Sequence, residues 1–123
     1  MSNDSKNSQW ESLCREQDLV AEAGVAVWSP AGAIALFWLP DTRQQLFAIG
    51  HFDPMSEANV LARGIVGDIQ GEPVVASPIY KHHYSLESGQ CLEEEDVRVP
   101  VFPARLHQGE VQIIVGEARR HVA

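Results

Sequence analysis

The sequence predicts an all-β fold, an antiparallel sandwich or barrel. Short runs rich in β-branched and aromatic residues recur along the 123 residues, and turns containing Gly or Pro separate them. Only the segment 16–22 has the composition of a helix, and it is short. Regularly spaced short strands with such turns are typical of antiparallel sheets that enclose a single core.

The individual strands follow from composition and turn signals. The segments expected to be strands are 25–28, 33–39, 45–49, 73–76, 82–86, 101–107 and 111–115. Ser29-Pro30-Ala31-Gly32 predicts a hairpin between the first two, and Gln108-Gly109-Glu110 predicts one between the last two. In the last strand Val111, Ile113 and Val115 alternate with Gln112, which predicts one buried face, although Ile114 breaks the alternation.

Length and composition indicate one globular domain. The 123 residues suffice for a single core, and a hydrophobic content of 45% is ordinary. No apolar run reaches the roughly 18 residues of a membrane-spanning helix, and the start of the chain lacks the apolar centre of a signal peptide. We therefore expect a cytoplasmic protein with a disordered leader over 1–9, one domain over 10–116 and a frayed tail over 117–123.

The formal net charge of −8 argues against nucleic acid as a partner, because the phosphate backbone would be repelled. No polybasic stretch is present that would attract an anionic membrane. The acidic residues gather in the run Glu93-Glu94-Glu95-Asp96. Two interpretations of this acidic run stay open: a solvated loop that maintains solubility, or a docking patch for a basic surface.

Residues that could carry chemistry by themselves favour structural roles. Cys14 and Cys91 lie far apart and outside the usual metal-ligand spacings, so we expect two buried, reduced thiols. Adjacent residues of a strand point to opposite faces, so His82 and His83 are not expected to chelate one ion. His51 can hydrogen-bond within the turn that follows it. We expect neither a catalytic residue nor a metal site in this chain.

No glycine-rich phosphate loop or dinucleotide fingerprint is present, so the chain has no motif for a flavin or a nicotinamide. Ser77 lacks the elbow glycines of a hydrolase nucleophile. Trp10, Trp28 and Trp38 are expected in the core, and an exposed one among them would suit an interface anchor.

The run from Ser77 to Leu92 carries the most specific pattern in the chain. Its frame consists of Pro78, Tyr84, Leu86, Gly89, Cys91 and Leu92. It resembles the second cluster-binding loop of the Rieske iron–sulfur family, Cys-Pro-x-His-Gly-x-x-Phe-x-Leu-x-Thr-Gly-x-Cys-Leu. Ser77 stands at the Cys position of that loop and Tyr80 at the His position. A Rieske centre binds one iron through two Cys and the other through two His.

A second segment, 52–61, resembles the first loop of that family, Cys-Pro-His-x-Gly-x-x-Leu. Asp53 stands at the Cys position and Met55 at the His position, while the turn proline Pro54 is kept. Such side chains are poor substitutes for thiolate and imidazole ligands. The resemblance therefore implies a Rieske-like antiparallel β-sandwich or barrel with an inserted small loop subdomain. That subdomain would carry degenerate cluster-binding loops and no cluster, with Asp53, Met55, Ser77 and Tyr80 at the former ligand positions.

A Rieske-like sequence without any of the four ligands resembles one family, the small subunits of cytoplasmic NAD(P)H-dependent nitrite reductases. The resemblance covers about 10–115 and rests on Trp10 with Cys14 and on the segments 49–54, 60–64 and 75–78. It implies a supporting role for a large subunit that reduces nitrite to ammonium in nitrate assimilation. FAD, sirohaem and an iron–sulfur cluster would belong to that large subunit. This chain would hold no cofactor and would be inactive alone.

Two other hypotheses stay open: a stand-alone Rieske-type ferredoxin, against which the missing ligands argue, and a free-standing β-sandwich binding module. For a subunit, the expected partner interface is the tip of the two loops, because that end faces the redox partner in the Rieske family. Apolar side chains there suit an interface centre. The tip residues are Phe52, Met55, Ile79, Tyr80 and His82. Tyr80 is expected to be partly buried between the loops, where it would replace the metal sterically.

Overall fold

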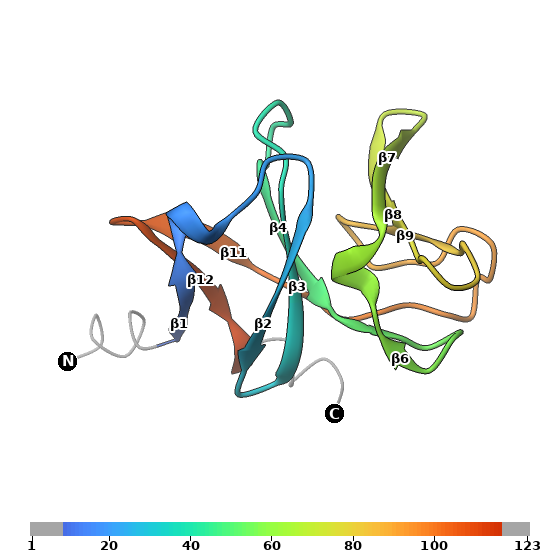
Figure 1. Ribbon diagram of the computed structural model, residues 1–123, viewed down its shortest axis with the longest axis horizontal. Helices are drawn as coiled ribbons and strands as arrows, with labels where there is room; N and C mark the ends of the chain where they lie inside the picture. Colours follow the sequence, from blue (N-terminus) through green and yellow to red (C-terminus); the bar gives the residue numbers. More distant parts are fainter. Residues whose placement is uncertain (1–8, 117–123) are drawn as a thin grey trace.

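The computed structural model describes residues 9–116 and consists mainly of antiparallel strands (Figure 1). The strands are β1 (Trp10–Arg15), β2 (Gly24–Ser29), β3 (Gly32–Trp38), β4 (Leu46–Gly50), β5 (Phe52–Asp53), β6 (Ala58–Asn59), β7 (Ile65–Ile69), β8 (Glu72–Ala76), β9 (His83–Ser85), β10 (Val101–Phe102), β11 (Ala104–His107) and β12 (Glu110–Ile114). Two 3-10 helices accompany them, η1 (Glu16–Asp18) and η2 (Leu61–Arg63). Apart from Gln9, the expected leader and tail lie outside the described residues. Within 9–116 there is no helix with the length and apolar character needed to cross a membrane.

Two antiparallel sheets form the larger part of the molecule, with strand orders β1-β12-β11 and β10-β4-β3-β2. The predicted hairpin between β2 and β3 is confirmed, since the pairing ends with Ser29 opposite Gly32. The predicted face of the last strand is also confirmed, because Val111, Ile113 and Val115 are all buried. Together the sheets confirm the all-β class.

A smaller part is inserted between β4 and β10, which are neighbours in one sheet with Val101 opposite Ile49. It contains the β5-β6 hairpin and a sheet in the order β7-β8-β9. Figure 1 shows this inserted part on the right, beyond β4. The expected inserted loop subdomain is therefore present, and it carries both segments that resemble cluster-binding loops.

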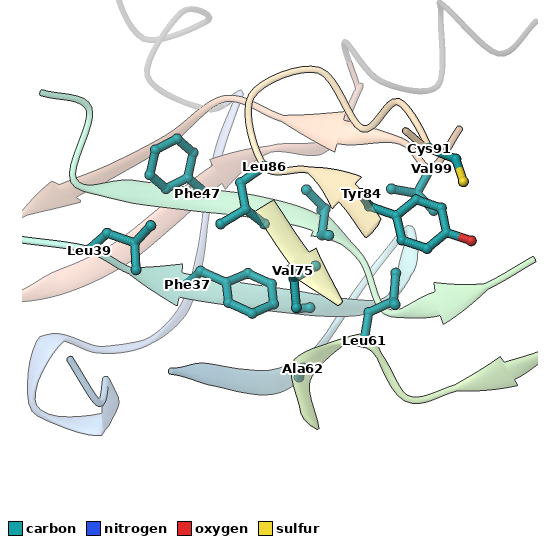
Figure 2. Packing of buried hydrophobic residues seen from close by; sticks show 12 residues of the cluster. Phe37, Leu39, Phe47, Leu61, Ala62, Val75, Tyr84, Leu86, Cys91 and Val99 are labelled. Atoms are coloured by element: carbon teal, nitrogen blue, oxygen red, sulfur yellow. The ribbon is translucent and has the colours of Figure 1, made fainter. Parts of the chain in front are cut away.

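The inserted part is held to the sheets by a shared hydrophobic core. Alternate residues of β3 point to its two faces and are buried on both. Ile34 and Leu36 belong to a cluster with residues of β12, whereas Phe37 belongs to a second cluster with Val75 of β8 and Tyr84 of β9 (Figure 2). Each such side chain, once fully buried, contributes about 1.5–3 kcal/mol. This packing fixes the loops relative to the larger sheets.

Gly89 shows why one residue of the sequence frame is kept. Its backbone has a φ of +81°, and a Cβ there would lie too close to the carbonyl oxygen of Val99. Only glycine accommodates both the left-handed backbone and the close approach of the neighbouring chain.

Some expectations about secondary structure were wrong. The helix expected over 16–22 is the single 3-10 turn Glu16–Asp18, because the chain is already extended at Leu19. The strands β1 and β7 were not predicted. Within residues 9–116, β1 is a half-polar strand at a sheet edge that pairs only with β12, and β7 is a largely exposed edge strand that pairs only with β8. Neither therefore needs the apolar alternation that marks a half-buried strand.

The expectation that all three tryptophans lie in the core was also wrong. Trp28 is 77% exposed on β2. Trp10 and Trp38 are half-buried, and the guanidinium of Arg105 lies 4.1 Å from the centre of the Trp10 ring. Cys14 and Cys91 are both free thiols, as expected, but only Cys91 is fully buried.

Candidate functional site

The two loops meet at the carboxylate of Asp53, which is fully buried at 0% exposure. This carboxylate accepts hydrogen bonds from the hydroxyls of Ser77 at 2.5 Å, Tyr84 at 2.7 Å and Ser56 at 2.8 Å. It also accepts one from the backbone N–H of Met55 at 3.0 Å. Because the donors come from both loops and from β9, this single side chain joins three segments of the inserted part. We call this arrangement the Asp53 network.

The charges in the Asp53 network follow from its geometry. Burial raises the pKa of the Asp53 carboxyl, but the hydroxyls of Ser77, Tyr84 and Ser56 and the amide of Met55 outweigh burial, and the pKa is lowered. The pKa of Tyr84 is raised by burial and then by its bond to Asp53 and the charge of that residue. At neutral pH Asp53 is thus an ionised acceptor and Tyr84 a protonated donor, which gives stronger hydrogen bonds than two neutral groups would.

The expectation for Tyr80 was wrong. Its side chain is 61% exposed and does not fill the space between the loops. The second loop closes as a tight turn in which the N–H of Lys81 donates to the carbonyl of Ser77, and Lys81 has a φ of +66°. The hydrogen bond from Ser77 to Asp53, and not the ring of Tyr80, joins this turn to the first loop.

Sequence reasoning missed the Asp53 network, although the sequence contains a signal for it. Asp53 and Ser77 stand at the two expected Cys positions, and one can only accept while the other can donate a hydrogen bond. Tyr84 stands where the Rieske pattern has Phe and adds a hydroxyl to the ring. Figure 2 shows the Tyr84 ring at one end of the hydrophobic cluster, with its hydroxyl pointing away from Phe37.

The side chains at the expected ligand positions do not fit a Rieske centre. Both oxygens of Asp53 accept hydrogen bonds, and the hydroxyl of Ser77 is used as a donor. Met55 offers a half-buried thioether, and Tyr80 is exposed. A Rieske centre requires two thiolates and two imidazoles. Across residues 9–116, no three side chains of His, Cys, Asp or Glu are grouped so as to hold a metal ion.

His51 and His83 have different partners and do not form a joint site. His51 is buried, and its Nδ1 accepts a hydrogen bond from the N–H of Ala62 at 3.1 Å, which ties it to η2 and not to its own turn. Burial and then the charge of Arg63 lower the pKa of His51. His83 is paired with Glu93, whose carboxylate oxygens lie 2.6 Å from its Nδ1 and 2.8 Å from its backbone nitrogen.

The five expected tip residues differ in exposure. Phe52 is 48% exposed and Ile79 is 45% exposed, so with Tyr80 they place three large apolar side chains at the surface. Met55 and His82 are half-buried. The acidic run 93–96 is at the surface, and in the described part of the chain only Glu93 of this run pairs with a histidine, His83.

Comparison with known proteins agrees with this fold and these loops. Residues 9–114 match the family described as Rieske-like [2Fe-2S] domain, so the molecule is a Rieske-like domain. It is 40% identical over 106 residues to the nitrite reductase (NADH) small subunit of Salmonella typhimurium, covering 86% of this chain and 97% of that protein. A crystal structure described as an NADH-dependent nitrite reductase small subunit from Mycobacterium tuberculosis shares 42% identity and a TM-score of 0.77, covering 85% of this chain and 92% of that one. Within the Rieske-like domains, the chain belongs to the family of nitrite reductase small subunits.

Another relative has a different organisation. The chain is 35% identical over 104 residues to a protein of Klebsiella oxytoca named nitrite reductase [NAD(P)H] large subunit. The match covers 85% of this chain but only 11% of that protein. In the Klebsiella protein the homologous segment is therefore part of the large subunit's own chain.

Proposed function

We propose that this chain is the small subunit of a cytoplasmic NAD(P)H-dependent nitrite reductase that serves nitrate assimilation. In this proposal the large subunit reduces nitrite to ammonium and holds the FAD, the sirohaem and an iron–sulfur cluster. The small subunit is inactive alone and supports the large subunit through contacts. The observation that carries the proposal is the occurrence of the module as a separate small subunit in one relative and within a large subunit in another. A module found in both arrangements is expected to lie against the large subunit.

We further infer that this chain carries no [2Fe–2S] cluster. The buried Asp53 network supports this inference, because Asp53 and Ser77 bond to each other at the positions where the Rieske family places its cysteines. The test is to express the chain with ample iron and sulfide and to measure bound iron and visible absorption. We expect a colourless protein. About two iron atoms per chain with a Rieske-type electron paramagnetic resonance signal would contradict the inference and favour the ferredoxin hypothesis.

The tip is proposed as part of the surface that contacts the large subunit. Its three exposed apolar side chains are Phe52, Ile79 and Tyr80. Exposed apolar groups gathered at one end of a small domain are typical of protein interfaces. The acidic run 93–96 is expected to affect the association rate and its salt dependence more than the final affinity.

Binding and activity together test the subunit role. Purified small and large subunits are mixed, and co-purification and nitrite-dependent NADH oxidation are measured. Ile79→Asp should leave the domain folded, weaken binding and reduce nitrite reduction. Ile65→Asp is the matched control, since Ile65 is 72% exposed on β7 and is not a tip residue. Absence of binding by the wild-type chain to any flavo-sirohaem protein would reject the subunit role and leave the binding-module hypothesis.

A further inference from the structure

A hollow beside Trp28 takes no part in the Asp53 network. It consists of two adjoining pockets of about 350 Å³ and 250 Å³, which share Ala33, His51 and Asn59 in their walls. Phe52 lines the larger pocket and Trp28 lines the smaller one. We call this hollow the Trp28 groove. Two of its aromatic residues are exposed, Trp28 at 77% and Phe52 at 48%, whereas Phe102 in the larger pocket is buried.

Three polar side chains line the Trp28 groove, those of His51, Asn59 and Arg98. Asn59 and Arg98 are exposed, whereas His51 is buried and its ring is held by the N–H of Ala62. A backbone N–H can only donate, so the Nδ1 that accepts from Ala62 carries no proton and the ring proton is on Nε2. No residue within 9–116 accepts a hydrogen bond from this Nε2–H. Protonation of Nδ1 would break the bond to Ala62, so the ring stays neutral at neutral pH. The groove thus combines apolar walls with N–H donors at His51, Asn59 and Arg98, which suits an apolar side chain beside a carbonyl oxygen.

The groove is continuous with the tip through the β5-β6 hairpin. Phe52 lies opposite Asn59 in this hairpin, and both line the groove. The same hairpin carries Asp53, whose carboxylate bonds to the turn of Ile79 and Tyr80. Phe52 therefore lines the groove and is also a tip residue, so the groove adjoins the tip there.

An ordinary protein interface needs more area than the tip residues alone offer. A specific interface takes about 800 Å² from each partner, and burial of one aromatic side chain supplies about 150–250 Å². The tip offers Phe52, Tyr80 and Ile79, all of them already partly covered. Addition of Trp28 and the groove enlarges this surface and supplies a concave centre, where the residues that dominate binding energy are usually found.

We propose that the Trp28 groove is the anchoring site for the large subunit of the nitrite reductase. An apolar side chain of the large subunit fills the groove, and a neighbouring carbonyl oxygen accepts a hydrogen bond from His51 Nε2. This proposal rests on the proposed function. The Klebsiella relative supports the choice of occupant. There the homologous module and the large subunit are one chain, so the large subunit is always close enough to contact the surface of the module.

Two variants test the groove in opposite ways. Trp28→Ala removes a wall, and Ala33→Leu fills the floor that both pockets share. Ile65→Ala is the control, because Ile65 is exposed to a similar degree, at 72%, but lies on β7 outside the groove. The affinity of each variant for the cofactor-loaded large subunit is measured by isothermal titration calorimetry, and thermal unfolding shows that each is folded.

We expect Trp28→Ala and Ala33→Leu each to weaken binding by about 10-fold or more, and Ile65→Ala to bind as the wild type does. If the wild-type chain binds and both groove variants keep its affinity, the anchoring site is not here, although the subunit role stands. A loss on Ile79→Asp without any loss on Trp28→Ala likewise overturns the groove proposal and confines the interface to the tip. If the wild-type chain does not bind, both the subunit role and the groove proposal fall.

Discussion

Ser77 Oγ lies 2.5 Å from Asp53 Oδ2 and donates a hydrogen bond to it. The resemblance to Rieske loops predicts that these two residues stand at the positions of the cysteines that bind the same iron. Here the contact between the loops is direct, and Tyr84 adds a second hydroxyl to the same carboxylate. The two loops are thus held together by a buried carboxylate and the neutral hydroxyls that donate to it.

Asp53→Asn is expected to lower the free energy of unfolding by about 2–4 kcal/mol, because the amide nitrogen replaces an acceptor and leaves a buried donor facing a donor. Urea denaturation with an unchanged slope measures this loss. Asp96→Asn, a change of the same kind at an exposed position, is the control and should unfold as the wild type does. Equal stability of the Asp53 variant and the control would show that the network contributes little.

Acid should weaken the Asp53 network. The pKa of Asp53 is lower in the folded chain than its ordinary value of 3.8, so the unfolded chain binds the proton first as pH falls. The stabilisation is complete above that ordinary value and is lost as pH falls through the folded value. Urea denaturation between about pH 2 and pH 6 should therefore show a steeper loss for the wild type than for Asp53→Asn.

Glu93 gives the control for this acid dependence. Burial raises its pKa, but the backbone N–H and the ring of His83 outweigh burial and lower it, so its contribution has the same sign. Because Glu93 is exposed, solvent screens this contribution. Glu93→Gln should keep most of the acid dependence of the wild type. If it removes as much of that dependence as Asp53→Asn does, the buried network is not its source.

The hydroxyls of Ser77 and Tyr84 should be coupled through Asp53. Ser77→Ala and Tyr84→Phe are each expected to cost about 1.5–3 kcal/mol, since each removes a hydrogen bond to a charged group. The loss in the double variant should differ from the sum of the two single losses by about 0.5 kcal/mol or more. Tyr84→Phe combined with Ser12→Ala is the control pair, because within residues 9–116 the Ser12 hydroxyl bonds only to Gln112, across β1 and β12. Simple additivity of the first pair would show that the hydroxyls act independently.

Tyr80→Ala is expected to change the free energy of unfolding by less than about 0.5 kcal/mol, as is usual for exposed positions. A partly buried ring, which the sequence suggests, would instead make the loss about 2–4 kcal/mol. Tyr84→Ala is the matched comparison, because Tyr84 is fully buried and its truncation should cost about 3–5 kcal/mol. Chemical denaturation of the two variants distinguishes these cases, and a large loss for Tyr80→Ala would mean that its ring packs in solution.

The strands with a clear apolar pattern could be predicted from the sequence, edge strands such as β2 and β9 included, whereas the largely exposed strand β7 could not. The pattern of Val111, Ile113 and Val115 identifies a buried face because burial demands apolar residues there. β7 is a largely exposed edge strand, and its residues 65–69 are not constrained in this way. The resemblance to Rieske loops correctly located the inserted part, since turn residues such as Gly89 are required by the backbone itself.

The side-chain roles within the loops were harder to predict. The resemblance to a metal-binding pattern predicts which residues stand at the ligand positions, but it does not predict how these residues contact each other. The backbone of the turn at Lys81 directs Tyr80 outward, and no local sequence feature reveals this. The residue type of Trp28 suggests a place in the core. In the structure Trp28 lies on the edge strand β2, opposite Ala33 of β3, and its side chain is exposed to solvent.

The Asp53 network also bears on how the domain folds. Its bonds to Ser77 and Tyr84 span 24 and 31 positions of the chain. Contacts between such distant residues form after the intervening chain is ordered, and a carboxylate loses its water only when its donors are in place. We therefore expect these bonds to be absent from the folding transition state. Interactions that form after the barrier slow unfolding and leave the folding rate nearly unchanged, so the buried carboxylate prolongs the lifetime of the closed loops.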